Sequence, residues 1–129
     1  MVPNSILVVD DNLANLKLMR ILLGDAGYDV HTASSAEDAL RLLTDHAPRV
    51  ILMDVQLPGM SGLELTRRLK ADAATRDITV VAVTAYAARG DEERTRAAGC
   101  DEYVAKPVDI DALLQTIARL VAREQEGKQ

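Results

Sequence analysis

The sequence has no Trp and no Phe, and its only aromatic side chains besides histidine are three Tyr. A core must therefore be built from Leu, Val, Ile, Ala and Met. Exposed rings on which nucleic-acid bases could stack are scarce. Asp and Glu outnumber Lys and Arg, 20 to 15, for a net charge of −5. A protein without a basic surplus binds a phosphate backbone poorly. These absences argue against DNA or RNA as a partner.

Cysteine is limited to Cys100, which excludes an internal disulfide and is compatible with a reducing compartment. We expect Cys100 to be a small residue packed near a helix end rather than a catalytic thiol, because neither His31 nor His46 lies in a partner motif. Both histidines also lack a Cys or carboxylate at ligand spacing, which argues against a zinc site.

Long apolar segments are missing as well, since no run approaches the roughly 18 residues that a membrane span needs. The N-terminus lacks the basic region of a signal peptide, and its apolar run over residues 6–9 stops at two Asp. We therefore expect a cytoplasmic protein without a membrane partner. A length of 129 residues predicts one domain over residues 1–129, with a core of about 5–122.

An unbroken apolar run over residues 50–53 leads directly into Asp54, and turn residues follow at Pro58, Gly59 and Gly62. A run of this length that is closed by turn residues is typical of a strand buried on both faces. Asp54 is therefore predicted to stand at the carboxyl end of a buried strand. Open α/β sheets bind their ligands at that end of the strands.

Four further segments are predicted to be strands, and three of them also lead into polar residues. Residues 5–10 end at Asp10 and Asp11, residues 78–84 end at Thr84, residues 101–105 end before Lys106, and residues 28–32 form a short strand.

Amphipathic segments separate these strands. Capping residues place helix starts after Asn12, Ser34, Ser61 and Asp109, with capping boxes formed by Ser34 and Glu37 and by Ser61 and Glu64. Residues 87–98 are also expected to be helical, but their buried side offers only Ala, so this helix should pack weakly.

Alternation of five strands with five helices predicts an α/β fold, a parallel sheet covered on both faces and joined by right-handed crossovers. The flavodoxin-like strand order 2-1-3-4-5 is favoured for a chain of this length. It makes the first and third strands neighbours. Asp10 and Asp11 would then lie beside Asp54, with Thr84 and Lys106 on the other flank.

Three clustered carboxylates repel one another unless a positive charge intervenes. Mg²⁺ suits such a cluster, because it takes carboxylate and carbonyl oxygens and accepts phosphate oxygens in its remaining positions; Mn²⁺ is possible too. This predicts Asp54 as a nucleophile that forms an aspartyl phosphate, assisted by the Lys106 ammonium and the Thr84 hydroxyl. Taken singly, each residue has a plainer explanation as a helix cap, a solvated cation or an ordinary strand residue.

Two other functions compete with this interpretation. A Mg²⁺-dependent phosphohydrolase would also use an Asp nucleophile, but Val55 and Gln56 follow Asp54, so there is no second acid two residues on. A flavodoxin-like cofactor carrier needs a loop rich in Ser, Thr or Gly where Asp10 and Asp11 stand.

The segments V-V-D-D-N, L-M-D-V-Q-L-P-G-M-S-G, A-V-T-A and Y-V-A-K-P are spaced through the whole predicted fold. Their order resembles the receiver domain of bacterial response regulators (the CheY-like superfamily). M-D-V-Q-L-P, G-D-E-E-R and A-G-C-D-E-Y are in turn similar to single-domain DivK-type regulators. The resemblance covers residues 5–122.

The resemblance implies that Asp54 accepts phosphate from a phosphohistidine on a sensor histidine kinase or a histidine phosphotransfer protein. It also implies that Asp11, Asp54 and the backbone carbonyl of Gln56 are direct metal ligands, and that Asp10 acts largely through metal-bound water.

The resemblance further implies a conformational switch. Thr84 would move towards the phosphoryl group, Tyr103 would turn inward, and the Lys106–Pro107 peptide bond would be cis. The alternative to this switch role is that Tyr103 is an ordinary half-buried strand residue, and the switch role is modestly favoured. Gln56 and Tyr86 would flank the path of the hydrolytic water, and a bulky Tyr86 would slow loss of the phosphoryl group; alternatively, Tyr86 contacts a partner.

The protein is therefore expected to act as a stand-alone phosphoacceptor switch and not as an enzyme. We expect it to be a monomer or a weak homodimer. Its output surface, for a downstream protein target, would be the face made by the fourth helix, the fifth strand and the fifth helix. The alternative is a receiver module excised from a hybrid kinase or a multidomain regulator.

Overall fold

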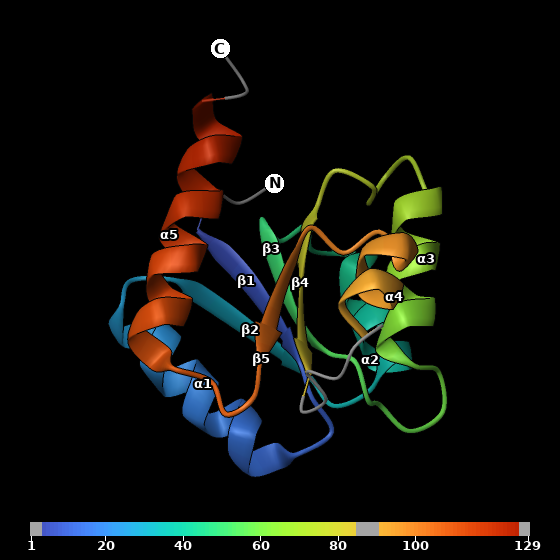
Figure 1. Ribbon diagram of the computed structural model, residues 1–129. Helices are drawn as coiled ribbons and strands as arrows, with labels where there is room; N and C mark the ends of the chain where they lie inside the picture. The colour runs from blue at the N-terminus through green and yellow to red at the C-terminus, as the bar shows by residue number, and fades with distance from the viewer. Residues whose placement is uncertain (1–3, 85–90, 127–129) are drawn as a thin grey trace.

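The computed structural model describes residues 4–84 and 91–126. Within them, strands and helices alternate (Figure 1). The strands are β1 (Ser5–Val9), β2 (Asp29–Ala33), β3 (Val50–Asp54), β4 (Thr79–Thr84) and β5 (Glu102–Ala105). The helices are α1 (Leu13–Asp25), α2 (Ala36–Leu43), α3 (Gly62–Ala71), α4 (Asp91–Ala98) and α5 (Ile110–Glu126).

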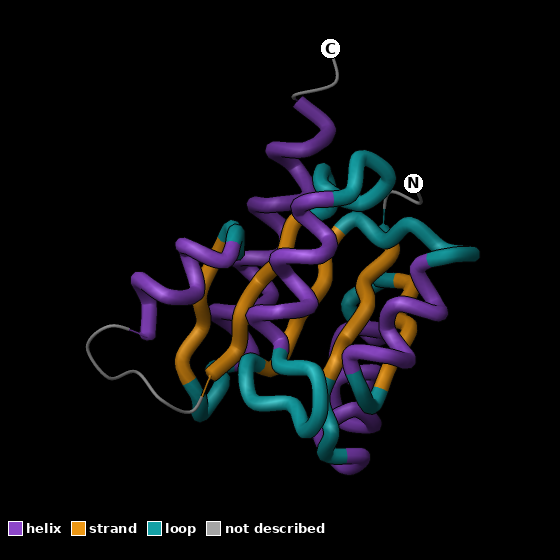
Figure 2. The backbone as a smooth tube through the Cα atoms, turned by 90° about the vertical axis from the view of Figure 1, so that its right-hand side faces the viewer, coloured by secondary structure: helices purple, strands orange, loops and turns teal. Residues whose placement is uncertain are grey.

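The strands form one parallel sheet in the order β2-β1-β3-β4-β5, which confirms the predicted fold class and strand order. Figure 2 shows the strands side by side, with the loops gathered at their two ends. Because β1 lies between β2 and β3, its Val9 is paired with Met53 of β3. The residues that follow β1 therefore lie beside the end of β3.

Helices cover both faces of the sheet, with α1 and α5 on one side and α2, α3 and α4 on the other (Figure 1). Alternate residues of each central strand enter opposite cores, as a parallel strand buried on both faces requires. Leu7 and Ile51 pack in the core under α2 and α3, whereas Ile6 and Leu52 pack in the core under α1 and α5. This double burial explains the unbroken apolar runs of β1 and β3.

The helix starts agree with the predicted caps at three positions and differ at one. Asn12, Ser61 and Asp109 each accept a hydrogen bond from a backbone N–H of the first turn. The predicted capping box of Ser34 with Glu37 is wrong.

Ser35 caps α2 and accepts from the Asp38 N–H at 3.1 Å. The sequence holds two overlapping cap patterns one residue apart, and the structure uses the second of them. Glu37 Oε1 accepts instead from the Met60 N–H, at 3.4 Å.

Helix α4 begins at Asp91, so the first part of the helix predicted over residues 87–98 lies outside the described residues. Among the α4 side chains that the structure describes, Thr95 and Ala98 are buried. Both are small, which agrees with the expected weak packing. Gly99 follows with a φ of +108° and ends the helix in the left-handed region that glycine tolerates.

None of the helices in residues 4–84 and 91–126 combines the length and apolar character needed to cross a bilayer.

Candidate functional site

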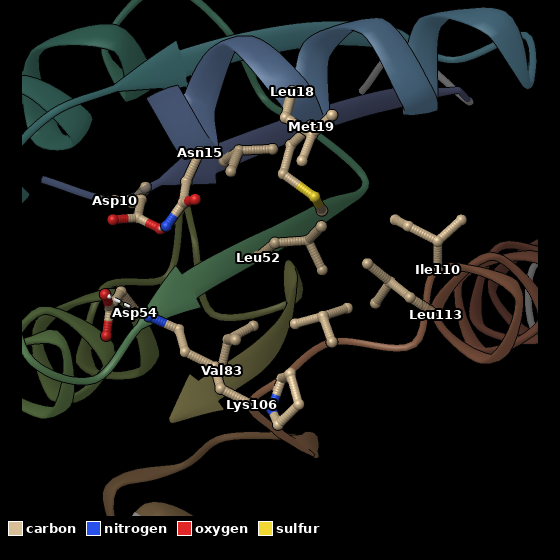
Figure 3. Close-up of a pocket in the computed structure, with 14 residues that line it drawn as sticks. Asp10, Asn15, Leu18, Met19, Leu52, Asp54, Val83, Lys106, Ile110 and Leu113 are labelled. Atoms are coloured by element: carbon tan, nitrogen blue, oxygen red, sulfur yellow. Dashed lines mark hydrogen bonds and ion pairs between the residues drawn. The ribbon is translucent and has the colours of Figure 1, made fainter. Parts of the chain in front are cut away.

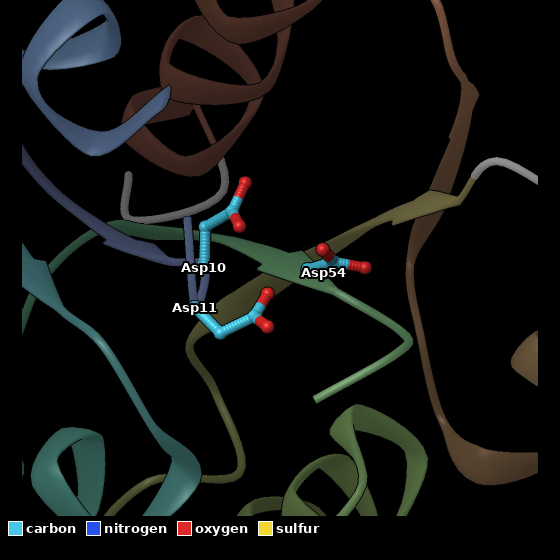
Figure 4. A group of neighbouring side chains, drawn as sticks. All are labelled: Asp10, Asp11 and Asp54. Carbon is cyan, nitrogen blue, oxygen red and sulfur yellow. The ribbon is translucent and has the colours of Figure 1, made fainter. Parts of the chain in front are cut away.

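Three carboxylates lie together at the carboxyl ends of β1 and β3 (Figure 4). Asp54 is the last residue of β3 and is 6% exposed, and Asp10 directly follows β1 and is 9% exposed. One oxygen from each of Asp10, Asp11 and Asp54 lies within 4.8 Å of the other two. Parallel pairing of β1 with β3 thus brings together acids that are more than 40 residues apart in the chain.

The loops after the strands orient the two buried acids. Asp10 Oδ1 accepts a hydrogen bond from the Asn12 N–H, and Asp54 Oδ1 accepts one from the Gln56 N–H, both at 2.9 Å. Each acid therefore accepts from the backbone two residues further on, the arrangement of an Asx turn. The carboxylates are held by backbone geometry, independently of any bound ligand.

Negative charge accumulates at this cluster. The pKa of Asp10 is raised above its ordinary value, first by burial and further by the neighbouring Asp54 carboxylate. The Asn12 N–H and the Lys106 ammonium act in the opposite direction and lower the pKa of Asp10, without cancelling the rise. A cation placed between the acids would offset the repulsion and stabilise their charged forms.

Lys106 approaches Asp54 from the other flank, where its Nζ lies 3.0 Å from Asp54 Oδ2. Pairing of Thr84 with Ala105 at the ends of β4 and β5 sets this position, and the Lys106 N–H donates to the Thr84 carbonyl at 2.7 Å. Thr84 itself is 1% exposed. The Lys106–Pro107 peptide bond is cis, as the sequence resemblance implies.

The structure describes two of the three remaining residues that were singled out from sequence. Gln56 follows Asp54 in the loop between β3 and α3, and Tyr103 is half-buried in β5, paired with Ala82 of β4. Tyr86 lies outside the described residues.

A cavity of about 300 Å³ adjoins the acids and was not anticipated from the sequence (Figure 3). Its polar side includes Asp10, Asp54 and Lys106, and apolar side chains of α1, α5 and the sheet form the rest. The Asn15 amide points towards Asp10, with Nδ2 3.4 Å from Asp10 Oδ2. The position of Asn15 one turn into α1 was the available signal for this contact.

Gly62, expected only to shape a turn, has a second role. A Cβ atom at this position would overlap the backbone carbonyl of Asp54 and press on the Met53 side chain. Only glycine lets the start of α3 approach the end of β3 this closely. The reason is this close approach and not the backbone conformation, since Gly62 is not among the glycines with a positive φ. Local sequence shows the glycine but not the backbone that faces it.

The two histidines, which showed no partner in the sequence, contact each other in the structure. The rings of His31 and His46 stack with their centroids 4.7 Å apart, and His31 Nε2 lies 3.2 Å from Asp29 Oδ2. This pair lies outside the acidic cluster, whose three carboxylates are close enough to share a metal ion.

The acidic cluster fits a hard divalent cation. Its side-chain donors are carboxylate oxygens, which suit Mg²⁺ or Mn²⁺ better than the nitrogen and sulfur ligands that zinc prefers. Two of the three acids are largely buried and already oriented, so the cluster has both the charge and the rigidity that such an ion requires.

A model of the response regulator receiver domain family matches residues 6–118. The chain belongs to this family. Receiver domains are the phosphoacceptor signalling modules of two-component systems, and they bind Mg²⁺ at an acidic pocket. The polar-differentiation response regulator DivK of Brucella anthropi is 46% identical to this receiver domain over 115 residues, which cover 89% of this chain and 94% of that protein. Both the predicted family and the likeness to DivK-type regulators are confirmed.

Solved structures agree with the fold. A CheY-like response regulator receiver domain protein from Methanospirillum hungatei JF-1 superposes on this receiver domain with a TM-score of 0.88, at 31% identity and over 98% of both chains. The receiver domain of a sensor histidine kinase from Pseudomonas aeruginosa PAO1 gives a TM-score of 0.85 at 32% identity, over 92% of this chain and 98% of that chain. That protein holds a magnesium ion in its active site cleft.

Proposed function

We propose that this receiver domain accepts a phosphoryl group on Asp54 from the phosphohistidine of a sensor histidine kinase or a histidine phosphotransfer protein. The observation that carries the proposal is the setting of Asp54, a buried carboxylate with an ammonium 3.0 Å from one oxygen and two further acids within 4.8 Å. In the transfer, the P–N bond of the donor breaks and a P–O bond forms on Asp54, while the donor imidazole leaves with the electron pair. The carboxylate needs no general base.

Asp11, Asp54 and the Gln56 carbonyl would hold Mg²⁺, or Mn²⁺ in its place, with Asp10 acting through bound water. When bound, the cation supplies positive charge to the oxygens of the transferring phosphoryl group. Lys106 supplies a second positive charge from the opposite flank, and the N–H of Gln56 keeps the Asp54 carboxylate in one orientation. Charge neutralisation and positioning are what phosphoryl transfer chiefly requires.

The phosphoryl group would then drive a switch through Thr84 and Tyr103. Thr84 ends β4 beside the site, and Tyr103 lies in the neighbouring strand β5. We place the output on the face made by α4, β5 and α5, where a downstream protein target would bind. The small side chains with which α4 contacts the core support this choice, because an element with few apolar anchors shifts at low cost in free energy.

The lifetime of the phosphoryl group would be set by Gln56 and Tyr86, of which Tyr86 rests on sequence alone. The protein would act in the cytoplasm as a stand-alone switch, as a monomer or weak homodimer, and not as a turnover enzyme. The same site would serve a receiver module that is part of a hybrid kinase or multidomain regulator.

A phosphotransfer profile against the histidine kinases of the host tests this proposal. We expect label to pass from one or a few kinases to the wild-type chain in the presence of Mg²⁺, and not to Asp54→Asn. Asp45→Asn, which changes an exposed acid away from the cluster, should accept label like the wild type. Label that persists on Asp54→Asn would refute the assigned site.

A further inference from the structure

The ammonium group of Lys70, in α3, is held by three acceptors from segments that follow it in the chain. Lys70 Nζ lies 2.9 Å from Asp101 Oδ2, 2.8 Å from the Ile78 carbonyl and 3.2 Å from the Arg76 carbonyl. An ammonium has three N–H donors, so each of them has an acceptor here. Lys70 thereby links α3 to the start of β4 and to the turn after α4.

Asp101, which follows α4, is fastened to β4 as well. Its Oδ2 accepts from the Val80 N–H at 2.9 Å, and its own N–H donates to the Val80 carbonyl at 2.8 Å. The Asp101 carboxylate therefore receives both a backbone N–H and the Lys70 ammonium. Charge-assisted hydrogen bonds of this kind are stronger than neutral ones.

The two residues between α4 and Asp101 also fit tightly against α3. A Cβ atom on Gly99 would lie 2.8 Å from Lys70 Cγ, so the absent side chain leaves room for the Lys70 stem. Cys100 is buried, and its thiol donates to Thr66 Oγ1 of α3 at 3.7 Å. Residues 99–101 thus form one fixed segment, which we call the α4 anchor.

The body of α4 is held differently. Over residues 93–98, whose side chains are described, Thr95 and Ala98 are buried and the others are exposed. No Leu, Ile, Val or Met occurs in α4 to fill a larger hole in the core. Polar contacts and a close fit therefore fix the residues at the C-terminal end of the helix, whereas two small side chains make the core contacts of the helix body.

We propose that Lys70 and Asp101 make the α4 anchor a pivot, so that α4 changes its tilt about residues 99–101 when the switch operates and does not slide as a unit. This inference rests on the proposed phosphorylation switch. The anchor lies at the amino end of β4, whereas Asp54 and Thr84 lie at the carboxyl ends of their strands. A tilt about the anchor displaces the amino end of α4 more than the end beside residues 99–101.

A tilt and a slide of α4 would displace its residues by different amounts. At a rise of about 1.5 Å per helical residue, Glu93 lies about 6 Å farther along the axis of α4 from the anchor than Ala97 does. A tilt about the anchor would therefore move the backbone at Glu93 farther than the backbone at Ala97. A sliding helix would move both positions equally.

Residual dipolar couplings of backbone amides separate these two motions, because they report the orientation of each N–H bond and are insensitive to translation. The couplings are measured in Mg²⁺ with and without beryllofluoride, a phosphoryl analogue whose binding is followed by its bound fluorine signal. With the strands β1, β3 and β4 as the reference frame, we expect the couplings of α4 to change and those of residues 99–101 to stay constant.

Two variants test the role of the ion pair. Lys70→Met keeps most of the stem but removes the ammonium, so the couplings of residues 99–101 should now also change with beryllofluoride. Exchange of the Cys100 and Asp101 amides should rise several-fold, because the hydrogen bonds from the Lys70 ammonium to Asp101 and to two backbone carbonyls are lost. Arg119→Met is the matched control. It removes another ion pair of 3.0 Å, which joins α5 to Glu102, the first residue of β5. It should behave as the wild type.

Three results would overturn the pivot. If beryllofluoride binds and the α4 couplings stay constant while its amide shifts change, the helix slides and the pivot is wrong, although the switch remains. The same holds if Lys70→Met matches the wild type in both couplings and exchange. If no fluorine signal of a bound analogue appears, the proposed phosphorylation site fails, and the pivot fails with it.

Discussion

The Lys106 ammonium lies 3.0 Å from Asp54 Oδ2 although 51 residues separate the two side chains in the chain. Neighbouring parallel strands β3, β4 and β5 bring them together, since each strand delivers its last residue to one edge of the sheet. The pair combines a nucleophilic oxygen with a positive charge in a largely buried setting. The Lys106 charge should therefore affect the rate of phosphoryl transfer to Asp54.

Lys106→Met should slow phosphorylation of Asp54 by about 100-fold, the usual effect of removing one charged donor from the transition state. Mg²⁺ should bind more tightly to the variant, because the competing cation is gone. Stopped-flow measurement of phosphotransfer and a Mg²⁺ titration check the two effects separately. Lys17→Met, which changes an exposed lysine of α1, serves as the control. A variant that accepts phosphate at the wild-type rate would show that Lys106 is only a structural partner of Asp54.

Gly62→Ala should destabilise the fold by about 1–3 kcal/mol, because the added methyl group overlaps the Asp54 carbonyl and the end of β3 must shift. Gly24→Ala is the matched control. Apart from the neighbouring backbone of α1, no atom lies within 4 Å of a Cβ placed at Gly24, so this change should stabilise the protein by about 0.5–1 kcal/mol. Urea unfolding measures both effects. Equal free energies of unfolding for the two variants would mean that the close contact between Gly62 and Asp54 does not require glycine.

Asp10 should make the stability of the metal-free protein depend on pH. A carboxylic acid whose pKa is higher in the folded chain than in the unfolded chain favours folding when protonated, and this contribution is lost as the pH rises through the folded-state pKa. The pKa of Asp10 is raised from its ordinary value of 3.8, chiefly by burial. In EDTA, Asp10→Asn should therefore be more stable than the wild type at neutral pH, with an advantage that shrinks as the pH falls towards 3.8.

Urea unfolding in EDTA across this pH range measures whether Asp10→Asn is more or less stable than the wild type. Excess Mg²⁺ should reduce this advantage of Asp10→Asn, because the wild type keeps all three acids, binds the cation more tightly, and is therefore stabilised more by mass action. An Asp10→Asn protein that is less stable than the wild type in EDTA at neutral pH would contradict the electrostatic account.

Tyr86→Ala should shorten the life of the aspartyl phosphate several-fold if the ring shields the acyl phosphate from water. Tyr86→Phe keeps the bulk of the ring and should retain the wild-type lifetime. Loss of radiolabel from the isolated phosphoprotein measures the rate. An unchanged rate in Tyr86→Ala would leave Tyr86 as a residue that contacts a partner.

Mg²⁺ with beryllofluoride should alter hydrogen exchange in residues 87–103 more than in residues 13–24. The second segment belongs to α1, which buries Leu16 and Leu23 in the core, whereas the described part of α4 is held by small side chains. Mass-spectrometric exchange on peptides from both segments makes the comparison. Equal changes in the two segments would count against a switch on the face of α4, β5 and α5.

Much of the site was predictable because its members stand at strand ends. Asp54, Asp10 and Thr84 follow apolar runs, and the order of those runs with intervening helices leaves few topologies. Lys106 was predictable for the same reason, and its cis bond to Pro107 followed from the family resemblance. The roles assigned to these residues remain predictions that the experiments above address.

Contacts between side chains that are distant in the chain could not be predicted from the sequence. Glu37 was expected to cap its own helix, but it accepts from the Met60 N–H in the loop between β3 and α3, and Ser35 is the cap instead. The ring of His31 stacks on that of His46, two residues that looked isolated. In each case, the local pattern allowed several partners, and the position of a separate element selected one.

The sequence by itself determined which segments are buried strands, where they end, and therefore which acids, hydroxyl and ammonium share one edge of the sheet. Hydrophobic periodicity and turn residues are local signals, and parallel topology converts them into a shared edge. Only the tertiary structure decided that Gly62 must lack a side chain beside Asp54 and that Lys70 fastens Asp101. These depend on the distance between packed backbones, which no local pattern encodes.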